Sequence, residues 1–319
     1  MRKNIYDKLY VADAHADTAT VCGGEFYCND KCHLDLERAA EYLNLQVFAF
    51  FQKPEGKPWL EWQSICRHHD KFAEALLKFN GVDMLKSGAQ LQDPDRTWAV
   101  SAIEAVDCFA WFEDKRFFLN ELQRRHFKII GLFWNNNNWA GSGADSNLPK
   151  AIDTGLTLGG RKFLEQLAEY DFILDLAHAS RRSFADVCEI YSKPFMVSHC
   201  CCAGLQPHRR NLTDEQLKTV GGRNGYVGIA FYPYFLTGSD TATADDIAEH
   251  IRHAVNMAGT DAVGLGSDFD GIETLPEGID GCQSLRLLAN KLEEKGLRQD
   301  DIEKVMGRNL QRFLRDNID

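Results

Sequence analysis

Three histidines and three acidic residues stand at or just beyond the ends of short apolar segments: His15, Asp17, Glu104, His178, His199 and Asp268. Imidazole nitrogens and carboxylate oxygens are the usual ligands of catalytic zinc, and a further carboxylate can work as a general acid or base. His15 and Asp17 are two residues apart, so both side chains point the same way on an extended strand. If the segments end at one place, this set predicts a metal site with a proton-transfer group.

The elements that would position these residues are eight short apolar segments, mostly separated by stretches of helix length: 8–15, 45–51, 98–104, 127–134, 172–178, 195–199, 226–232 and 262–268. Each is almost continuously hydrophobic, as is typical of strands buried on both faces of a parallel sheet. Segments 159–170 and 244–259 are amphipathic, and 282–296 and 299–316 indicate two closing helices. This order predicts a (β/α)8 TIM barrel, whose active site lies at the carboxyl ends of its strands.

The sequence between these elements predicts one domain, 1–319. No GxGxxG motif follows the first predicted strand, which disfavours a dinucleotide-binding sheet, and no Pro/Gly/Ser-rich linker divides the chain. We expect the insertion 52–97 to be helical. The Gly- and Asn-rich segment 135–160 is expected to form a long loop on the rim of the active site.

Composition and charge exclude several kinds of partner. The net charge is −11 and no Lys/Arg-rich stripe is present, so we expect no nucleic-acid partner. The N-terminus lacks the apolar region of a secretory signal and no apolar run reaches membrane-spanning length, so we expect no membrane partner and a cytoplasmic location. In that compartment the ten cysteines are expected to be thiols.

Six motifs carry a resemblance to a known family: DAHADT, SAIEAVD, ILDLAHAS, VSHCCCAG, PHRRNLTDEQL and VGLGSDFDG. In this order, from about residue 10 onwards, the chain resembles the membrane (renal) dipeptidases, peptidase family M19 of the amidohydrolase superfamily. The resemblance implies a zinc-dependent dipeptidase acting on small dipeptides, including those with a D-residue at the C-terminal position. The family is often dimeric, so a homodimer is one state that the resemblance allows.

The resemblance also implies a role for each motif residue. His15 and Asp17 would bind one zinc ion, His178 and His199 a second, and Glu104 together with a hydroxide would bridge them. Asp268 would take the proton of the attacking water and pass it to the leaving amine. Arg210 would hold the C-terminal carboxylate of the substrate. We prefer it to Arg209 because it directly precedes Asn211.

The substrate-facing residues depart from the family pattern. Trp134 stands where the family commonly has an oxyanion-binding histidine, so Asn135 or Asn137 is expected to assist there. Ala105-Val106-Asp107 replaces the frequent Gly-Gly-His after the glutamate. Tyr232, at the end of the seventh predicted strand, is a further candidate for the substrate pocket. These departures leave two alternatives open: an amidohydrolase acting on another amide such as an N-acyl amino acid, and a catalytically silent binding protein.

The remaining polar residues have structural interpretations. Asp13 and Asp175 are candidates for hydrogen-bond partners behind the ligands, and Asp270 is a weaker alternative to Asp268. Cys28, Cys32 and His33 lack the second Cys/His pair that a zinc ribbon needs. We expect Cys200, Cys201 and Cys202 to begin the loop after His199, with Cys200 packed beside the site. The other histidines, His208 among them, are expected to be solvated or structural.

Overall fold

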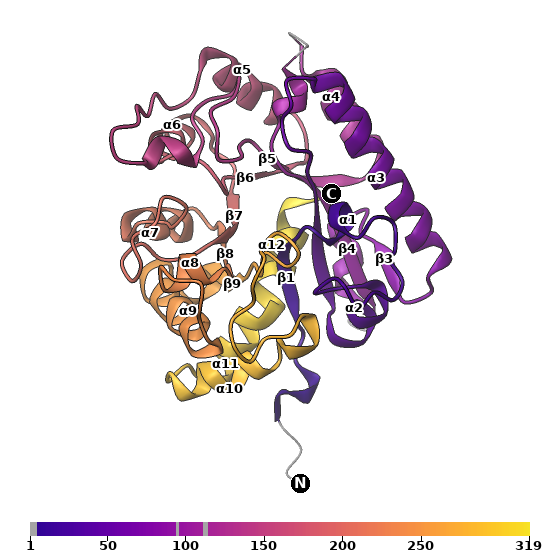
Figure 1. The fold of residues 1–319 in the computed structure, drawn as a ribbon, viewed down its shortest axis with the longest axis vertical. Helices are drawn as coiled ribbons and strands as arrows, with labels where there is room; N and C mark the ends of the chain where they lie inside the picture. The colour runs from indigo at the N-terminus through magenta and orange to yellow at the C-terminus, as the bar shows by residue number, and fades with distance from the viewer. Residues whose placement is uncertain (1–4, 94–95, 111–113) are drawn as a thin grey trace.

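The computed structural model describes residues 5–93, 96–110 and 114–319, so residues 1–4 and 111–113 of the predicted domain and residues 94–95 of the insertion 52–97 lie outside the described residues. All strands of the described chain are parallel and belong to one sheet. The strands are β1 Ala12–Ala16, β2 Leu45–Phe50, β3 Val82–Met84, β4 Thr97–Ile103, β5 Phe127–Gly131, β6 Ile173–Asp175, β7 Phe195–Cys200, β8 Tyr226–Ile229 and β9 Val263–Leu265. Pairing of β2 with β4 closes eight of them into the predicted (β/α)8 barrel (Figure 1).

The insertion 52–97 is only partly helical, which corrects the prediction. It contains the long helix α3, Pro58–Lys78, but also the short strand β3, Val82–Met84. β3 pairs with the start of β4, whereas β5 pairs with the end of β4, so β3 extends the sheet without entering the closed ring. A run of three residues is too short for periodicity to reveal.

Helices follow the strands around the barrel, as the alternating pattern predicts. Besides α3 they are α1 Thr18–Val21, α2 Leu36–Tyr42, α4 Arg116–Arg124, α5 Leu158–Leu167, α6 Arg181–Ile190, α7 Asp214–Gly222, α8 Pro233–Leu236, α9 Ala244–Ala258, α10 Leu287–Glu294, α11 Gln299–Glu303 and α12 Asn309–Asn317. Hydroxyl side chains cap several of them: Thr157 accepts from the N–H of Gly160, and Ser180 from that of Ser183. The second predicted closing helix is divided, because the backbone of Gly307 leaves helical geometry between α11 and α12.

The core is arranged so that one end of the barrel is apolar. Buried Val47, Val100, Ile129, Ile173 and Met196 belong to one cluster. They come from strands around the ring and therefore fill its interior. Leu310, Phe313 and Leu314 of α12 belong to the same cluster and cover the amino-terminal end of the barrel. No helix in the described part of the chain has both the length and the apolar character needed to cross a bilayer.

Most strands are shorter than predicted at their carboxyl ends. Glu104 lies one residue beyond β4, while Trp134, His178 and Asp268 each lie three residues beyond β5, β6 and β9. The polar residues therefore sit in the first turns of the loops. Only His15 and His199 lie within strands, β1 and β7.

Candidate metal centre

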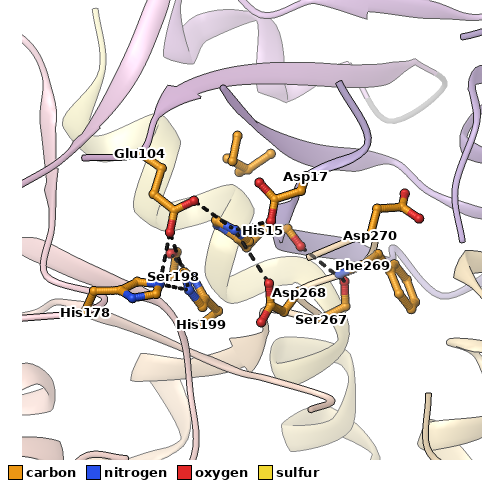
Figure 2. A network of polar contacts seen from close by, with 12 residues as sticks. His15, Asp17, Glu104, His178, Ser198, His199, Ser267, Asp268, Phe269 and Asp270 are labelled. Carbon is orange, nitrogen blue, oxygen red and sulfur yellow. Dashed lines mark hydrogen bonds and ion pairs between the residues drawn. The ribbon is translucent and has the colours of Figure 1, made fainter. Parts of the chain in front are cut away.

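The six acidic and histidine residues predicted from the sequence gather at the carboxyl ends of the strands (Figure 2). They form three overlapping groups in which the ligand atoms lie within 4.8 Å of one another: His15, Asp17 and Glu104; Glu104, His178 and His199; His15, His199 and Asp268. Five of the six side chains are buried, and Asp17 is partly exposed. No other such group occurs among the residues that the structure describes.

Glu104 lies between two sets of histidines and faces each with a different oxygen. Its Oε1 is 3.0 Å from His178 Nε2 and 3.9 Å from His199 Nε2, whereas its Oε2 is 3.9 Å from His15 Nε2. A carboxylate in this position can bind two cations, one on each oxygen. The geometry therefore matches the bridging role that the sequence resemblance implies.

The ring nitrogens of His178 and His199 are oriented by hydrogen bonds on the far side of each ring. His178 Nδ1 lies 2.9 Å from Asn135 Oδ1, and His199 Nδ1 lies 2.9 Å from Ser198 Oγ. An amide oxygen only accepts, so His178 carries its proton on Nδ1 and presents a lone pair on Nε2. The two Nε2 atoms are 2.9 Å apart, a spacing suited to shared ligation of one cation.

His15 has no hydrogen-bond partner for its buried Nε2 atom within the described structure. That atom points toward carboxylates, with Asp17 Oδ2 at 3.6 Å and Asp268 Oδ1 at 3.9 Å. Its ring also packs against that of His199, with centroids 3.9 Å apart. His15 Nε2 is thus a buried nitrogen without a hydrogen-bond partner in the described structure, and the carboxylates that face it lie beyond hydrogen-bond distance. A cation between them would bind to both kinds of ligand.

The acidic side chains of the cluster lie close together and are largely shielded from solvent, and both conditions shift their pKa values. Burial raises the pKa of Glu104 to about 8, and the charges of Asp17 and Asp268 act in the same direction. Burial likewise raises the pKa of Asp268 to about 7. Burial alone would lower the pKa of His15, but the adjacent carboxylates of Asp17, Glu104 and Asp268 raise it to about 10. A cation would relieve the repulsion among these carboxylates, so the residues present fit a metal.

The backbone at the site is held in unusual conformations. Ala105, His178 and Asp268 all have positive φ angles, 63°, 62° and 65°, although none is glycine. Such left-handed backbone is uncommon outside glycine and concentrates at functional sites. Gly271 lies close to the same site: a Cβ there would overlap Asp17 Oδ2 and Asp268 Oδ1, so a larger residue would displace two carboxylates of the site.

Asp13 and Asp175 lie behind the ligands and join neighbouring strands. Asp13 Oδ1 accepts from the N–H of Ser267 at 2.7 Å, and its Oδ2 accepts from Ser267 Oγ at 2.6 Å and from Gln46 Nε2 at 2.9 Å. Asp175 Oδ1 accepts from the N–H groups of Ala177 at 2.9 Å and Ser198 at 3.0 Å. Ser267 directly precedes Asp268, and Ser198 directly precedes His199. Each aspartate therefore positions a strand end that carries a site residue.

A pocket of about 550 Å³ opens above the cluster. Trp134, Asn135, Arg210 and Tyr232, the four predicted substrate contacts, all line it. Arg210 is buried with its Nε unpaired, and its Nη2 donates to the carbonyl of His199 at 3.3 Å. No carboxylate of the described residues pairs with it, whereas Arg209 Nε pairs with Asp145 at 3.0 Å. The preference for Arg210 over Arg209 thus agrees with the geometry.

His208 is a pocket residue that the sequence did not reveal. Its Nδ1 accepts from the N–H of Arg210 at 3.2 Å, and its ring packs on Phe235 with centroids 4.7 Å apart. Only its position two residues before Arg210 could have suggested this placement. Asn135, predicted as a substrate contact, also holds His178.

Asp270 does not join the candidate cluster, although its carboxylate lies nearby. It accepts from Thr18 Oγ1 and from the N–H of His33 at 2.7 Å, which occupies both oxygens. His33 therefore ties a surface loop to the segment that follows the last strand. Cys28 and Cys32 form no disulfide.

The three consecutive cysteines are fully buried free thiols. Cys200 is the last residue of β7, which corrects the prediction that it begins the loop. Cys201 Sγ lies 3.3 Å from the carbonyl of Ala230, and Cys202 Sγ lies 3.3 Å from that of His250. Burial raises the pKa of all three thiols. None belongs to a candidate metal cluster.

A (β/α)8 barrel with histidines and carboxylates at the carboxyl ends of its strands has the architecture of the metal-dependent amidohydrolases. Comparison with family models matches residues 1–318 to the membrane dipeptidases, peptidase family M19. The chain therefore belongs to this family.

The chain is also similar to two curated relatives in sequence and to a solved structure in fold. An uncharacterized protein of Klebsiella pneumoniae is 35% identical over 194 residues, 59% of this chain and 71% of that protein. Dipeptidase tcpJ of Claviceps purpurea is 30% identical over 200 residues, 62% of this chain but only 46% of that protein. A metallopeptidase of Rhodobacter sphaeroides, solved with a phosphinate mimic of L-Ala-D-Ala, has the same fold, with a TM-score of 0.84 at 20% identity over 97% of this chain and 99% of that one.

Proposed function

We propose that this protein is a zinc-dependent dipeptidase that hydrolyses the peptide bond of small dipeptides. The observation that carries the proposal is the cluster of five candidate ligands, four of them buried, beside Asp268 and a buried Arg210 that has no ion-pair partner among the described residues, at one pocket. Family membership and the dipeptidase among its relatives support this reading. The bound L-Ala-D-Ala mimic in a structural neighbour supports substrates with a C-terminal D-residue.

The donor set is suited to two zinc ions. His15 and Asp17 would hold one, His178 and His199 the other, with one oxygen of Glu104 toward each. When bound, zinc supplies polarisation of the scissile carbonyl and activation of a water molecule. Asn135 and Ser198 keep the imidazoles of His178 and His199 in place for this ligation.

Asp268 moves the proton in this mechanism. Its carboxylate lies in the cluster, 3.9 Å from His15 Nε2, and burial raises its pKa to about 7. A carboxylate in this position accepts a proton from the attacking water and returns it to the leaving amine. The left-handed backbone at Asp268 aims the side chain at the pocket floor.

Arg210 recognises the free C-terminal carboxylate of the substrate. A buried guanidinium with no anionic partner among the described residues leaves a strong donor unsatisfied, and a substrate carboxylate satisfies it. This contact restricts the enzyme to substrates that end one residue beyond the scissile bond.

The test combines metal analysis with a panel of L,L- and L,D-dipeptides. We expect two zinc ions per chain, and Asp268→Asn is expected to keep zinc while losing at least about 100-fold in kcat. Full activity of Asp268→Asn would overturn its assigned role. Hydrolysis of N-acetyl amino acids without hydrolysis of any dipeptide would favour the amidohydrolase alternative. A protein with neither zinc nor turnover would be a binding protein. The cytoplasmic location and the oligomeric state stay predictions.

A further inference from the structure

Two aromatic walls face each other across the mouth of the barrel. Phe51 directly follows β2 and Trp134 lies three residues after β5, and their rings pack with centroids 5.3 Å apart. Phe235 lies in α8, the short helix that follows β8, and Tyr232 directly precedes this helix. The centroids of their rings are 4.9 Å apart. All four residues line the pocket above the metal cluster.

The strand order places these walls on opposite sides. Around the closed ring the strands run β1, β2, β4, β5, β6, β7, β8, β9, so β8 lies diametrically opposite β4. Phe51 and Trp134 follow the two neighbours of β4, and Glu104 follows β4 itself. The Phe51–Trp134 wall therefore stands above Glu104, and the Tyr232–Phe235 wall stands across the pocket from it.

Arg210 belongs to the Tyr232–Phe235 side. It lies in the loop after β7, and its guanidinium carbon is 5.5 Å from the centroid of the Phe235 ring. A dipeptide whose C-terminal carboxylate binds Arg210 has its C-terminal residue beside Phe235. Its scissile carbonyl then lies over the cluster, and its N-terminal residue extends toward the opposite wall.

The Phe51–Trp134 wall is suited to an apolar side chain. Both rings are partly exposed, and buried Ile272 adds a further apolar group to the same pocket. Partly exposed aromatic faces in a concave site gain from contact with another apolar or aromatic group. None of these three side chains carries a charge that would select a polar residue.

We propose that the Phe51–Trp134 wall makes this enzyme selective for dipeptides with a bulky apolar, preferably aromatic, N-terminal residue. The inference rests on the proposed dipeptidase function and on Arg210 as the carboxylate site. The inference concerns substrate selectivity and not metal binding, because no hydrogen bond of the described structure joins either ring to a candidate metal ligand.

The experiment compares kcat/KM for Phe-Gly, Gly-Gly and Gly-Phe on the zinc-loaded protein. We expect Phe-Gly to exceed Gly-Gly by on the order of 100-fold, since a hydrophobic subsite gains roughly tenfold or more for each well-packed group. Trp134→Ala and Phe51→Ala are each expected to lower kcat/KM for Phe-Gly about tenfold more than they lower kcat/KM for Gly-Gly. Trp134→Phe retains an aromatic face and is expected to keep most of the ratio.

Tyr234→Ala is the matched control, since Tyr234 is an exposed aromatic residue on the opposite wall. It is expected to leave the ratio of Phe-Gly to Gly-Gly within about twofold, and zinc content of every variant reports an intact site. Equal hydrolysis of Phe-Gly and Gly-Gly by the unmodified protein would overturn the inference. So would a Trp134→Ala variant that loses all three activities equally, or that loses Gly-Phe alone. No hydrolysis of any of the three by the zinc-loaded protein would instead overturn the proposed function, and the inference with it.

Discussion

The site rests on two pairs of strands, β1 with β9 and β6 with β7, and each pair is joined by a buried aspartate. Asp13 uses both carboxylate oxygens and accepts from Ser267 and Gln46, so it links β1, β2 and the end of β9. Asp175 uses one oxygen for two backbone N–H groups. The first junction depends on both oxygens of a carboxylate, which accept from three donors, whereas the second depends on one acceptor atom. Stability and ligand geometry are therefore coupled at the first junction and more separable at the second.

The largest expected effect is at Asp13. Asp13→Ala leaves the buried N–H of Ser267 without an acceptor and removes two further hydrogen bonds, although Gln46 Nε2 keeps the carbonyl of Val47 and Ser267 Oγ keeps that of His15. We expect the free energy of unfolding to fall by about 4 kcal/mol, at roughly 1–3 kcal/mol for the unsatisfied group and roughly 0.5–1.5 kcal/mol for each lost hydrogen bond. Denaturant unfolding of the metal-free protein measures it. In Asp13→Asn an amide N–H₂ replaces one of the two accepting oxygens and faces a hydrogen-bond donor there. This variant is also expected to lower the free energy of unfolding, by about 2 kcal/mol. A loss below about 1 kcal/mol in Asp13→Ala would contradict the coupling.

Asp175 is expected to have a smaller effect and a different response to amide substitution. Asp175→Ala leaves two backbone N–H groups without their acceptor and is expected to lower the free energy of unfolding by about 2 kcal/mol. Asp175→Asn keeps the single oxygen that both donors use, so we expect it to be within about 0.5 kcal/mol of the original protein. The same unfolding assay decides this, and equal losses in the two Asn variants would remove the distinction between the junctions.

Asn135 tests ligand geometry at the second junction without changing its strand pairing. Asn135→Ala removes the acceptor for His178 Nδ1, and we expect zinc affinity to fall about tenfold, or about 1.4 kcal/mol. Competition with a chelating dye measures the affinity, and the free energy of unfolding of the metal-free protein is expected to change by less than 1 kcal/mol. An unchanged affinity would show that His178 is oriented by other contacts.

Ser198 is expected to show the smallest effect. Ser198→Ala removes the hydroxyl beside His199 Nδ1 but keeps the backbone N–H that Asp175 accepts, so we expect a two- to threefold loss of zinc affinity, about 0.5 kcal/mol. The same competition assay is used. A loss greater than that of Asn135→Ala would reverse the order proposed for the two histidines.

Much of the fold and of the site could be predicted from the sequence, because both depend on local signals. The eight barrel strands are buried on both faces and show as apolar runs, and the six site residues lie within three residues of the carboxyl ends of these strands. The exact strand ends could not be predicted, since β6 and β9 end three residues before the positive-φ residues His178 and Asp268. Nothing in the local pattern marks those bends.

Other contacts could not be predicted because they join distant parts of the chain. Gln46 meets Asp13 from another strand, and Asn135 meets His178 across 43 positions. His208 enters the pocket only because the loop before Arg210 folds back onto Phe235. Strand β3 is too short for its pattern to stand out within an otherwise helical insertion.

The buried thiols of Cys200, Cys201 and Cys202 have a practical consequence for kinetics. Burial and raised pKa keep them unreactive in the closed state, so a thiol reagent modifies them only while the end of β7 is transiently open. Exposed Cys28 reacts at once and supplies an internal reference. Cys22, Cys32, Cys108 and Cys282 are buried as well, so the slow reaction has to be followed on the peptide that contains residues 200–202. The ratio of that rate to the rate at Cys28 then reports how often the end of the strand carrying His199 opens, with and without zinc.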